Sequence, residues 1–129
     1  MTNLLVLNNE AYHNPWFLDT VKKEGNYEVE LVTTQKDYEI KISSGKYDMA
    51  LLIDLWIPGR EATKEEPWKS GLAILKDLKE RGLPVLVLSI EPEAVDEQAI
   101  ALGARVLRKP LLLEKIIGEL KQIEPKQIE

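Results

Sequence analysis

The sequence predicts an α/β fold in which helices cover both faces of a doubly wound, five-stranded parallel sheet. Short apolar runs alternate along the chain with longer segments of helical periodicity, as in parallel sheets joined by helical crossovers. Most of these runs are continuous, which is typical of strands buried on both faces. The 129 residues suffice for one domain, which we place at 1–124, with a polar tail at 125–129.

Each element of this fold is predicted from local signals. The strands are the apolar runs at residues 4–7, 27–31, 49–53, 84–88 and 106–107. The helices are the periodic segments at residues 15–25, 34–44, 72–81, 93–102 and 112–123. Asn14 followed by Pro15 predicts the start of the first helix, because Asn caps helices and proline suits the first helical position. Apolar and acidic residues alternate in 27–31, which predicts a half-buried strand at an edge of the sheet.

Composition argues against several classes of function. A net charge of −5 disfavours a nucleic-acid-binding surface as the main role. The absence of cysteine rules out disulfides and thiolate chemistry, and a single histidine argues against histidine-rich metal sites. No apolar stretch approaches the roughly 20 residues that span a bilayer, and the first residues do not resemble a signal peptide. We therefore expect a cytoplasmic protein that does not bind membranes.

Polar side chains follow the strands at one edge of the predicted sheet. Asp54 ends the third strand, Ser89 ends the fourth, Lys109 follows the fifth, and Asn-Asn-Glu at 8–10 ends the first. In open α/β sheets this edge is where ligands bind. An unpaired buried carboxylate is strongly disfavoured, so Asp54 is the first candidate for chemistry. The alternative, that Asp54 merely opens a surface loop, is supported about equally by the sequence.

The order of these residues resembles that of response-regulator receiver domains, the CheY-like proteins. Asp54 precedes Pro58-Gly59, Gly71 begins the third helix, Ser89 ends the fourth strand, and Lys109-Pro110 follows the fifth. The resemblance covers essentially the whole chain and implies the flavodoxin-like strand order 2-1-3-4-5. It also implies a signalling domain rather than an enzyme. Such a domain receives a phosphoryl group from a histidine kinase or phosphotransfer protein and acts on a downstream protein target.

The resemblance assigns a role to three side chains. Asp54 is the implied phosphoacceptor, Ser89 the switch hydroxyl, and Lys109 the ammonium that pairs with the phosphoryl group. A carboxylate can act as the nucleophile, while a cation and a hydroxyl donor can hold phosphoryl oxygens. Two alternatives stay open, because Ser89 can cap the following helix and Lys109 can be a solvated loop lysine.

The cation site departs most from the pattern of the family. The family places an acidic pair after the first strand to hold Mg²⁺, whereas this chain has Asn8 and Asn9. The implied ligands are therefore Asp54, Asn9 and the Trp56 backbone carbonyl, with Glu10 as an alternative. Because Mg²⁺ seeks anionic oxygens, we expect weak binding and impaired Mg²⁺-dependent phosphorylation.

Three further departures concern access to Asp54 and the response to phosphorylation. Residues 60–69 form an insertion that alters access, Ile90 replaces a small residue beside the hydroxyl, and Val106 replaces the aromatic switch. Without an aromatic ring at Val106, the usual coupling of a hydroxyl shift to a ring flip is absent.

The three tryptophans at positions 16, 56 and 68 all fall near the same edge of the predicted sheet. Since tryptophan is enriched at binding anchors, one hypothesis is an aromatic patch that engages a partner near Asp54. The alternative is that these rings pack the long loop onto the domain.

The sequence thus predicts a stand-alone receiver-like module of two-component (phosphorelay) signalling. One alternative is a pseudo-receiver that acts only as a protein-interaction module. A second is a small Asp-dependent phosphatase of the haloacid-dehalogenase type, but that family requires a second aspartate where Trp56 stands and a nucleophile on the first strand. A flavodoxin would need a Ser-, Thr- or Gly-rich phosphate loop at 8–16, which contains none of these residues. The oligomeric state is left open.

Overall fold

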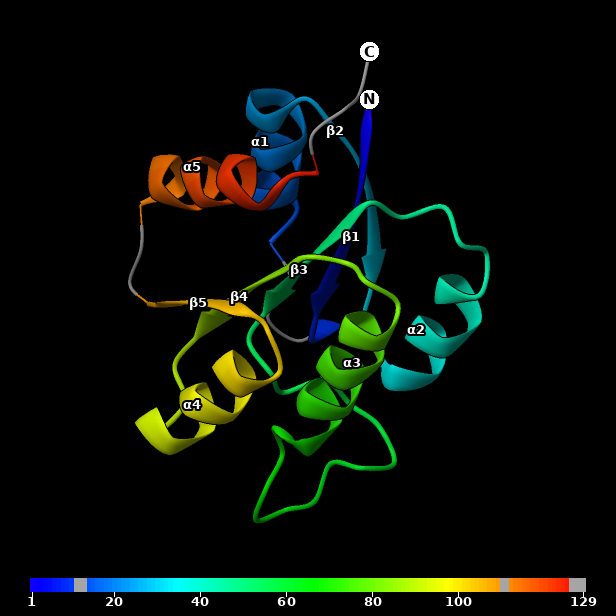
Figure 1. The fold of residues 1–129 in the computed structure, drawn as a ribbon, viewed down its shortest axis with the longest axis vertical. Coiled ribbons are helices and arrows are strands. Elements are labelled where there is room, and N and C mark those ends of the chain that lie inside the picture. Colours follow the sequence, from blue (N-terminus) through cyan, green and yellow to red (C-terminus); the bar gives the residue numbers. More distant parts are fainter. Residues whose placement is uncertain (11–13, 110–111, 126–129) are drawn as a thin grey trace.

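The computed structural model describes residues 1–10, 14–109 and 112–125, and within them it confirms the predicted fold. Five parallel strands form one sheet in the order β2-β1-β3-β4-β5, and five helices alternate with them (Figure 1). The strands are β1 (Thr2–Asn8), β2 (Tyr27–Val32), β3 (Met49–Ile53), β4 (Val85–Ser89) and β5 (Arg105–Arg108). The helices are α1 (Pro15–Gly25), α2 (Gln35–Ile42), α3 (Lys69–Glu80), α4 (Glu93–Ala101) and α5 (Leu113–Ile123). Pro110 and the tail from 126 onward lie outside the described residues.

Two hydrophobic cores form, one on each face of the sheet. Leu5 and Leu7 of β1 belong to the core under α2, α3 and α4, whereas Leu4 and Val6 belong to the core under α1 and α5. Figure 1 shows this division, with α1 and α5 together on one side of the strands. All four side chains are fully buried. Burial on both faces explains why the strand sequence is a continuous apolar run rather than an alternating one.

The register of the sheet aligns the carboxyl ends of its strands. Asn8 lies opposite Ile53, Ile53 lies opposite Leu88, and Ser89 lies opposite Arg108. The residues that follow these positions therefore leave the sheet at nearly the same level. This arrangement confirms that the strand ends share one edge.

Helix α3 packs directly against the backbone that follows β3. A Cβ atom on Gly71 would lie 2.3 Å from the carbonyl oxygen of Leu55 and 2.7 Å from its Cα. The Ser70 hydroxyl, which is fully buried, donates a hydrogen bond to the Ile57 carbonyl. These contacts fix the chain immediately after Asp54. They also give a physical reason for glycine at the start of the third helix.

The predicted start and end of helix α1 are both confirmed. The Asn14 side chain accepts from the N–H groups of Trp16 and Phe17, as expected of a helix cap. Asn26, directly after Gly25, adopts the left-handed conformation that closes the helix, with φ 59°. Glycine at 25 instead makes room for a ring, because a Cβ there would lie 2.3 Å from Cε2 of Tyr27.

Helices α3 and α5 begin at other residues than predicted. Helix α3 begins at Lys69, earlier than its apolar periodicity indicates, because its first residues are polar apart from Gly71. Leu112, the first residue of the predicted last helix, precedes α5 and is 73% exposed.

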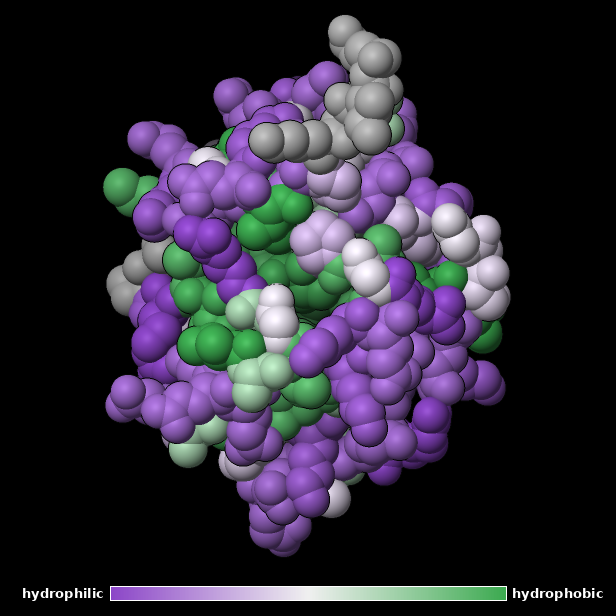
Figure 2. Space-filling model, viewed as in Figure 1, coloured by the Kyte–Doolittle hydropathy of each residue, from purple (hydrophilic) through white to green (hydrophobic). Residues whose placement is uncertain are grey.

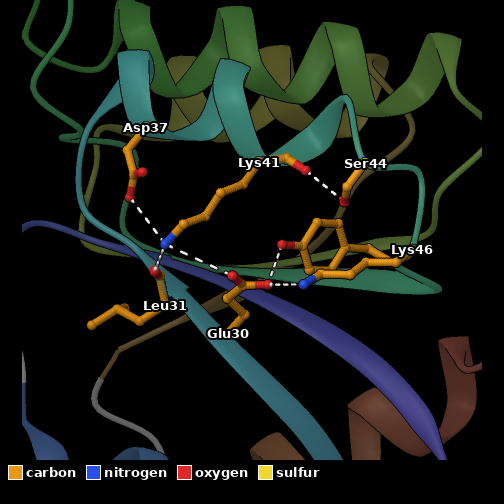
Figure 3. A network of polar contacts seen from close by, with 7 residues as sticks. Glu30, Leu31, Asp37, Lys41, Ser44 and Lys46 are labelled. Carbon is orange, nitrogen blue, oxygen red and sulfur yellow. Dashed lines mark hydrogen bonds and ion pairs between the residues drawn. The ribbon is translucent and has the colours of Figure 1, made fainter.

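An ion-pair network ties α2 to the edge strand β2 (Figure 3). The Lys41 ammonium lies 3.9 Å from the Glu30 carboxylate and 3.5 Å from that of Asp37, and the Lys46 ammonium lies 3.0 Å from Glu30. The Tyr47 hydroxyl donates to Glu30, and this hydrogen bond, together with that from Lys46, lowers the pKa of the Glu30 carboxyl. Each charge in this network has a partner, so the network stabilises the edge of the sheet.

Candidate functional site

Asp54 leaves the sheet in a left-handed backbone conformation. Its φ is 76°, and its N–H donates to the Leu88 carbonyl at 2.8 Å, which holds the residue beside β4. The Oδ1 atom accepts from the N–H of Leu55 at 2.7 Å. Aspartate tolerates this conformation better than most residues because its short side chain can form such a local bond. Backbone strain of this kind is concentrated at functional sites, and Asp54 is only half-buried, so its carboxylate is open to chemistry.

A second carboxyl group, that of Glu91, lies against Asp54. Glu91 follows β4 and is 3% exposed. Burial raises the pKa of Glu91 to about 7, and a side-chain hydrogen bond with Asp54 and the charge of Asp54 act in the same direction. A hydrogen bond from the Trp56 indole acts in the opposite direction. Burial and the neighbouring negative charge both disfavour the ionised form of Glu91, so they favour its protonated carboxyl group.

The Ser89 side chain forms a hydrogen bond with a residue of α4. Its hydroxyl donates to Oδ1 of Asp96 and accepts from the N–H of Glu91 at 3.0 Å. Arg108, at the end of β5, donates to the other carboxylate oxygen of Asp96. Ser89 and Asp96 are both buried. Ser89 therefore braces the turn that carries Glu91, and it makes no hydrogen bond to Asp54 in the part of the chain that the structure describes.

Lys109 reaches the same edge through its backbone. Its N–H donates to the Ser89 carbonyl at 2.9 Å, directly beyond the last paired residues of β4 and β5. The Lys109 side chain is exposed, and among the described residues its ammonium forms no ion pair with Asp54. The structure thus brings Asp54, Ser89 and Lys109 to one edge without direct contact between their side chains.

The residues expected around the cation site differ in exposure and in contacts. Asn8 is buried at the end of β1, and the Asn9 amide nitrogen donates to the Trp56 carbonyl at 3.4 Å. Glu10 is exposed. No group of three or more acidic, histidine or cysteine residues is placed to hold a metal ion, as far as the described residues show. Two carboxylates and a carbonyl still suit Mg²⁺, which keeps several waters and needs only one or two carboxylates.

The start of the insertion at 60–69 is held on α2. The Arg60 guanidinium donates to both oxygens of the Glu39 carboxylate. The N–H of Gln35 donates to the Pro58 carbonyl at 2.7 Å, and Gly59 lies so close to Gln35 that a Cβ would meet Oε1 at 2.2 Å. Figure 1 shows the insertion running beyond the start of α3 before it returns. These contacts hold residues 58–60, which lead into the insertion, on α2.

The other residues that differ from the family pattern, and the three tryptophans, differ in exposure. Ile90 is 59% exposed, while Val106 is half-buried against the core under α4. Trp16 and Trp56 are 66% and 40% exposed, and Trp68 packs against the same core as Val106. Two of the three indoles are thus available at the surface, and the aromatic patch stays a prediction.

Two other features of the surface are a group of apolar side chains and a cavity beside α2. Apolar side chains gather at the middle of the face shown in Figure 2, ringed by polar residues. A cavity of about 290 Å³ lies between α2, α3 and the insertion. The charged side chains that line this cavity are already paired, Arg60 with Glu39 and Arg81 with Asp77.

Among the described helices, none has the length and apolar character needed to cross a bilayer.

Sequence reasoning missed three residues of this site: Glu91, Asp96 and Arg108. Glu91 stands two residues after the end of a buried strand, so the rule that selected Asp54 could have selected it as well. Asp96 looks like an ordinary acid in the first turn of a helix, and Arg108 like a solvated strand residue. Their pairing depends on the tertiary structure and leaves no local pattern.

Comparisons with known proteins agree with the fold. No protein-family profile matches the sequence, and no curated protein does. Solved structures do match the fold. A receiver-domain protein (CheY-like) from Methanospirillum hungatei has a TM-score of 0.73 and 18% identity, covering 95% of this chain and 92% of its own. The receiver domain of NtrX from Brucella abortus has a TM-score of 0.74 and 21% identity, covering 93% and 96%. A two-component response regulator from Clostridium difficile has a TM-score of 0.74 and 21% identity, covering 95% of each chain.

Proposed function

We propose that this chain is a receiver module in which Asp54 accepts a phosphoryl group from a histidine kinase or phosphotransfer protein. The chain has the CheY-like receiver fold, with the sheet order β2-β1-β3-β4-β5. The observation that carries the proposal is the position of Asp54, half-exposed at the carboxyl end of the central strand β3. Ligands bind at this edge in doubly wound sheets.

The chemistry follows from the groups at this edge. A carboxylate oxygen of Asp54 attacks the phosphorus, the bond from phosphorus to the donor breaks, and the donor leaves with the electron pair of that bond. The product is an acyl phosphate on Asp54. A divalent cation, when bound, supplies positive charge to the phosphoryl oxygens. Lys109 follows β5 on a flexible four-carbon side chain and can bring a second positive charge to them.

We expect the same groups to make phosphorylation slow. Asn8 and Asn9 offer neutral oxygens where the family has carboxylates, so a cation is held less strongly. The Ser89 hydroxyl is already bonded to Asp96, and a hydrogen bond to a phosphoryl group requires it to leave that partner. The Glu91 carboxyl beside Asp54 opposes the arrival of a further negative group when it is ionised.

Intact-mass spectrometry tests this proposal. The protein is incubated with acetyl phosphate and Mg²⁺, and we expect the mass to increase by one phosphoryl group. Asp54→Asn must abolish the increase, whereas Asp19→Asn, at an exposed position on α1, must leave it unchanged. An adduct that persists in Asp54→Asn places the acceptor elsewhere and contradicts the assignment.

A second candidate is a pseudo-receiver that signals only through protein contacts. The closed Ser89–Asp96–Arg108 network favours it, because the Ser89 hydroxyl already donates to a buried partner within the network. This candidate predicts no adduct in the wild-type protein or in the Asn8→Asp, Asn9→Asp double variant, which supplies the missing acids. An adduct in the double variant alone indicates a receiver limited by its cation site.

A further inference from the structure

We propose that Glu91 provides a carboxylate ligand for a divalent cation at Asp54, in place of the acids that are absent after β1. The inference deepens the proposed function, because it names the residue that equips the same edge for a cation. It rests on contacts of Glu91 that are independent of any phosphorylation step.

The first observation is an unpartnered oxygen in a buried side chain. Glu91 is 3% exposed, and its Oε1 atom has no hydrogen-bond partner among the described residues. Its carboxyl group lies within hydrogen-bonding reach of Asp54 and of the Trp56 indole. A buried polar atom without a partner is costly, and in native proteins it commonly marks the place of a water or an ion.

The second observation concerns charge. Within the described part of the chain, no lysine or arginine forms an ion pair with Asp54 or Glu91. Two carboxylates in contact repel each other unless a proton or a cation lies between them. By contrast, the nearby Asp96 carboxylate is paired with Arg108. The Asp54–Glu91 pair is thus an acidic pair that lacks positive charge.

The third observation is the fixed path of the chain that carries Glu91. The N–H of Glu91 donates to the Ser89 hydroxyl at 3.0 Å, and this hydroxyl donates to Asp96, so the turn is braced from the sheet and from α4. Two residues after Asp54 in the chain, the Trp56 carbonyl accepts from the Asn9 amide at 3.4 Å. Carboxylate and carbonyl oxygens are the ligands of hard cations such as Mg²⁺ and Mn²⁺.

Binding of Mn²⁺, followed by water-proton relaxation, and of Mg²⁺, followed by calorimetry, tests the inference without any phosphoryl donor. We expect Glu91→Gln and Asp54→Asn each to weaken binding about tenfold or more, since each removes one charged ligand. Glu91→Asp keeps the charge on a shorter side chain, and we expect an affinity between those of the wild type and Glu91→Gln. Glu93→Gln, on the exposed first turn of α4, must leave the affinity unchanged.

Three results would overturn the inference. These are an unchanged affinity in Glu91→Gln, a loss of affinity in Glu10→Gln instead, and no binding by the wild-type protein at millimolar cation. Unfolding midpoints of each variant establish that the fold is kept. The proposed function is judged separately, by adduct formation on Asp54. Cation binding without an adduct refutes that function alone, and an adduct with unchanged binding in Glu91→Gln refutes only the role of Glu91.

Discussion

Replacement of Gly71 by alanine tests the packing that positions Asp54. Glycine at this position lets α3 begin against the backbone of Leu55, the residue directly after Asp54. An added Cβ would lie 2.3 Å from the Leu55 carbonyl oxygen, 2.7 Å from its Cα and 2.8 Å from its carbonyl carbon. These are backbone atoms and cannot move aside as the end of a flexible side chain can. Either the helix or the segment after β3 must therefore shift.

The expected cost follows from these distances. Ordinary contacts to a methyl group are about 3.5–4 Å, so the added carbon requires a displacement of roughly 1 Å. Forcing an extra methyl group into a packed site costs about 1–3 kcal/mol, and the clash with three backbone atoms places Gly71→Ala toward the upper end. Alanine regains up to about 1 kcal/mol through its higher helix propensity. We expect a net loss of about 1–2 kcal/mol in the free energy of unfolding.

Urea denaturation measures this loss, and Gly118→Ala is the matched control. Gly118 is also helical, but it is exposed on α5, and a Cβ added there would have no other atom within 4 Å. We expect Gly118→Ala to raise stability by up to about 1 kcal/mol. With a urea dependence of about 1–3 kcal/mol per molar, the two midpoints should differ by roughly 1 M in urea. If Gly71→Ala is as stable as Gly118→Ala, the close approach of α3 to Leu55 is refuted.

Two further predictions concern the carboxyl groups of the site. The pKa of Glu91 rises from 4.5 to about 7 on folding, so the folded protein holds this proton more tightly than the unfolded chain does. The stability that this proton contributes is complete below pH 4.5 and is lost as the pH rises toward 7, a loss of about 1–3 kcal/mol. In urea titrations at several pH values, Glu91→Gln should flatten this dependence and exposed Glu93→Gln should keep it; an equally steep dependence in Glu91→Gln would count against the assignment. Asp96→Ala should cost about 1–3 kcal/mol, because it leaves Arg108 and a buried hydroxyl without their partner, and a cost no larger than that of exposed Glu97→Ala would contradict the network.

Much of the fold could be predicted because its signals are local. Met49–Ile53 is buried on both faces, and such strands are continuous apolar runs. Helix α1 carries its own start signal in Asn14. Helix α2 was harder to predict, because its buried residues include the polar Gln35, which is held by the backbone at Pro58 and Gly59. Contacts of this kind join segments that are distant in the sequence.

The site could be predicted only in outline. Asp54 follows from its position at a strand end, and the shared edge follows from the parallel sheet. The direction of the Ser89 hydroxyl depends on Asp96, which lies on a different element. The burial of Glu91 depends on the turn after β4 and on Trp56. No local sequence pattern predicts either contact. Sequence position thus located the edge, and tertiary packing decided which groups face each other there.

The most direct test of the account is the initial rate at which acetyl phosphate modifies Asp54, measured by intact mass over a range of Mg²⁺ concentrations. We predict a slow, Mg²⁺-dependent rate in the wild-type protein and a faster rate in the Asn8→Asp, Asn9→Asp double variant, which restores the acids to the cation site. The account is contradicted if the double variant is not modified at Asp54 at any Mg²⁺ concentration, or if the wild-type rate does not depend on Mg²⁺.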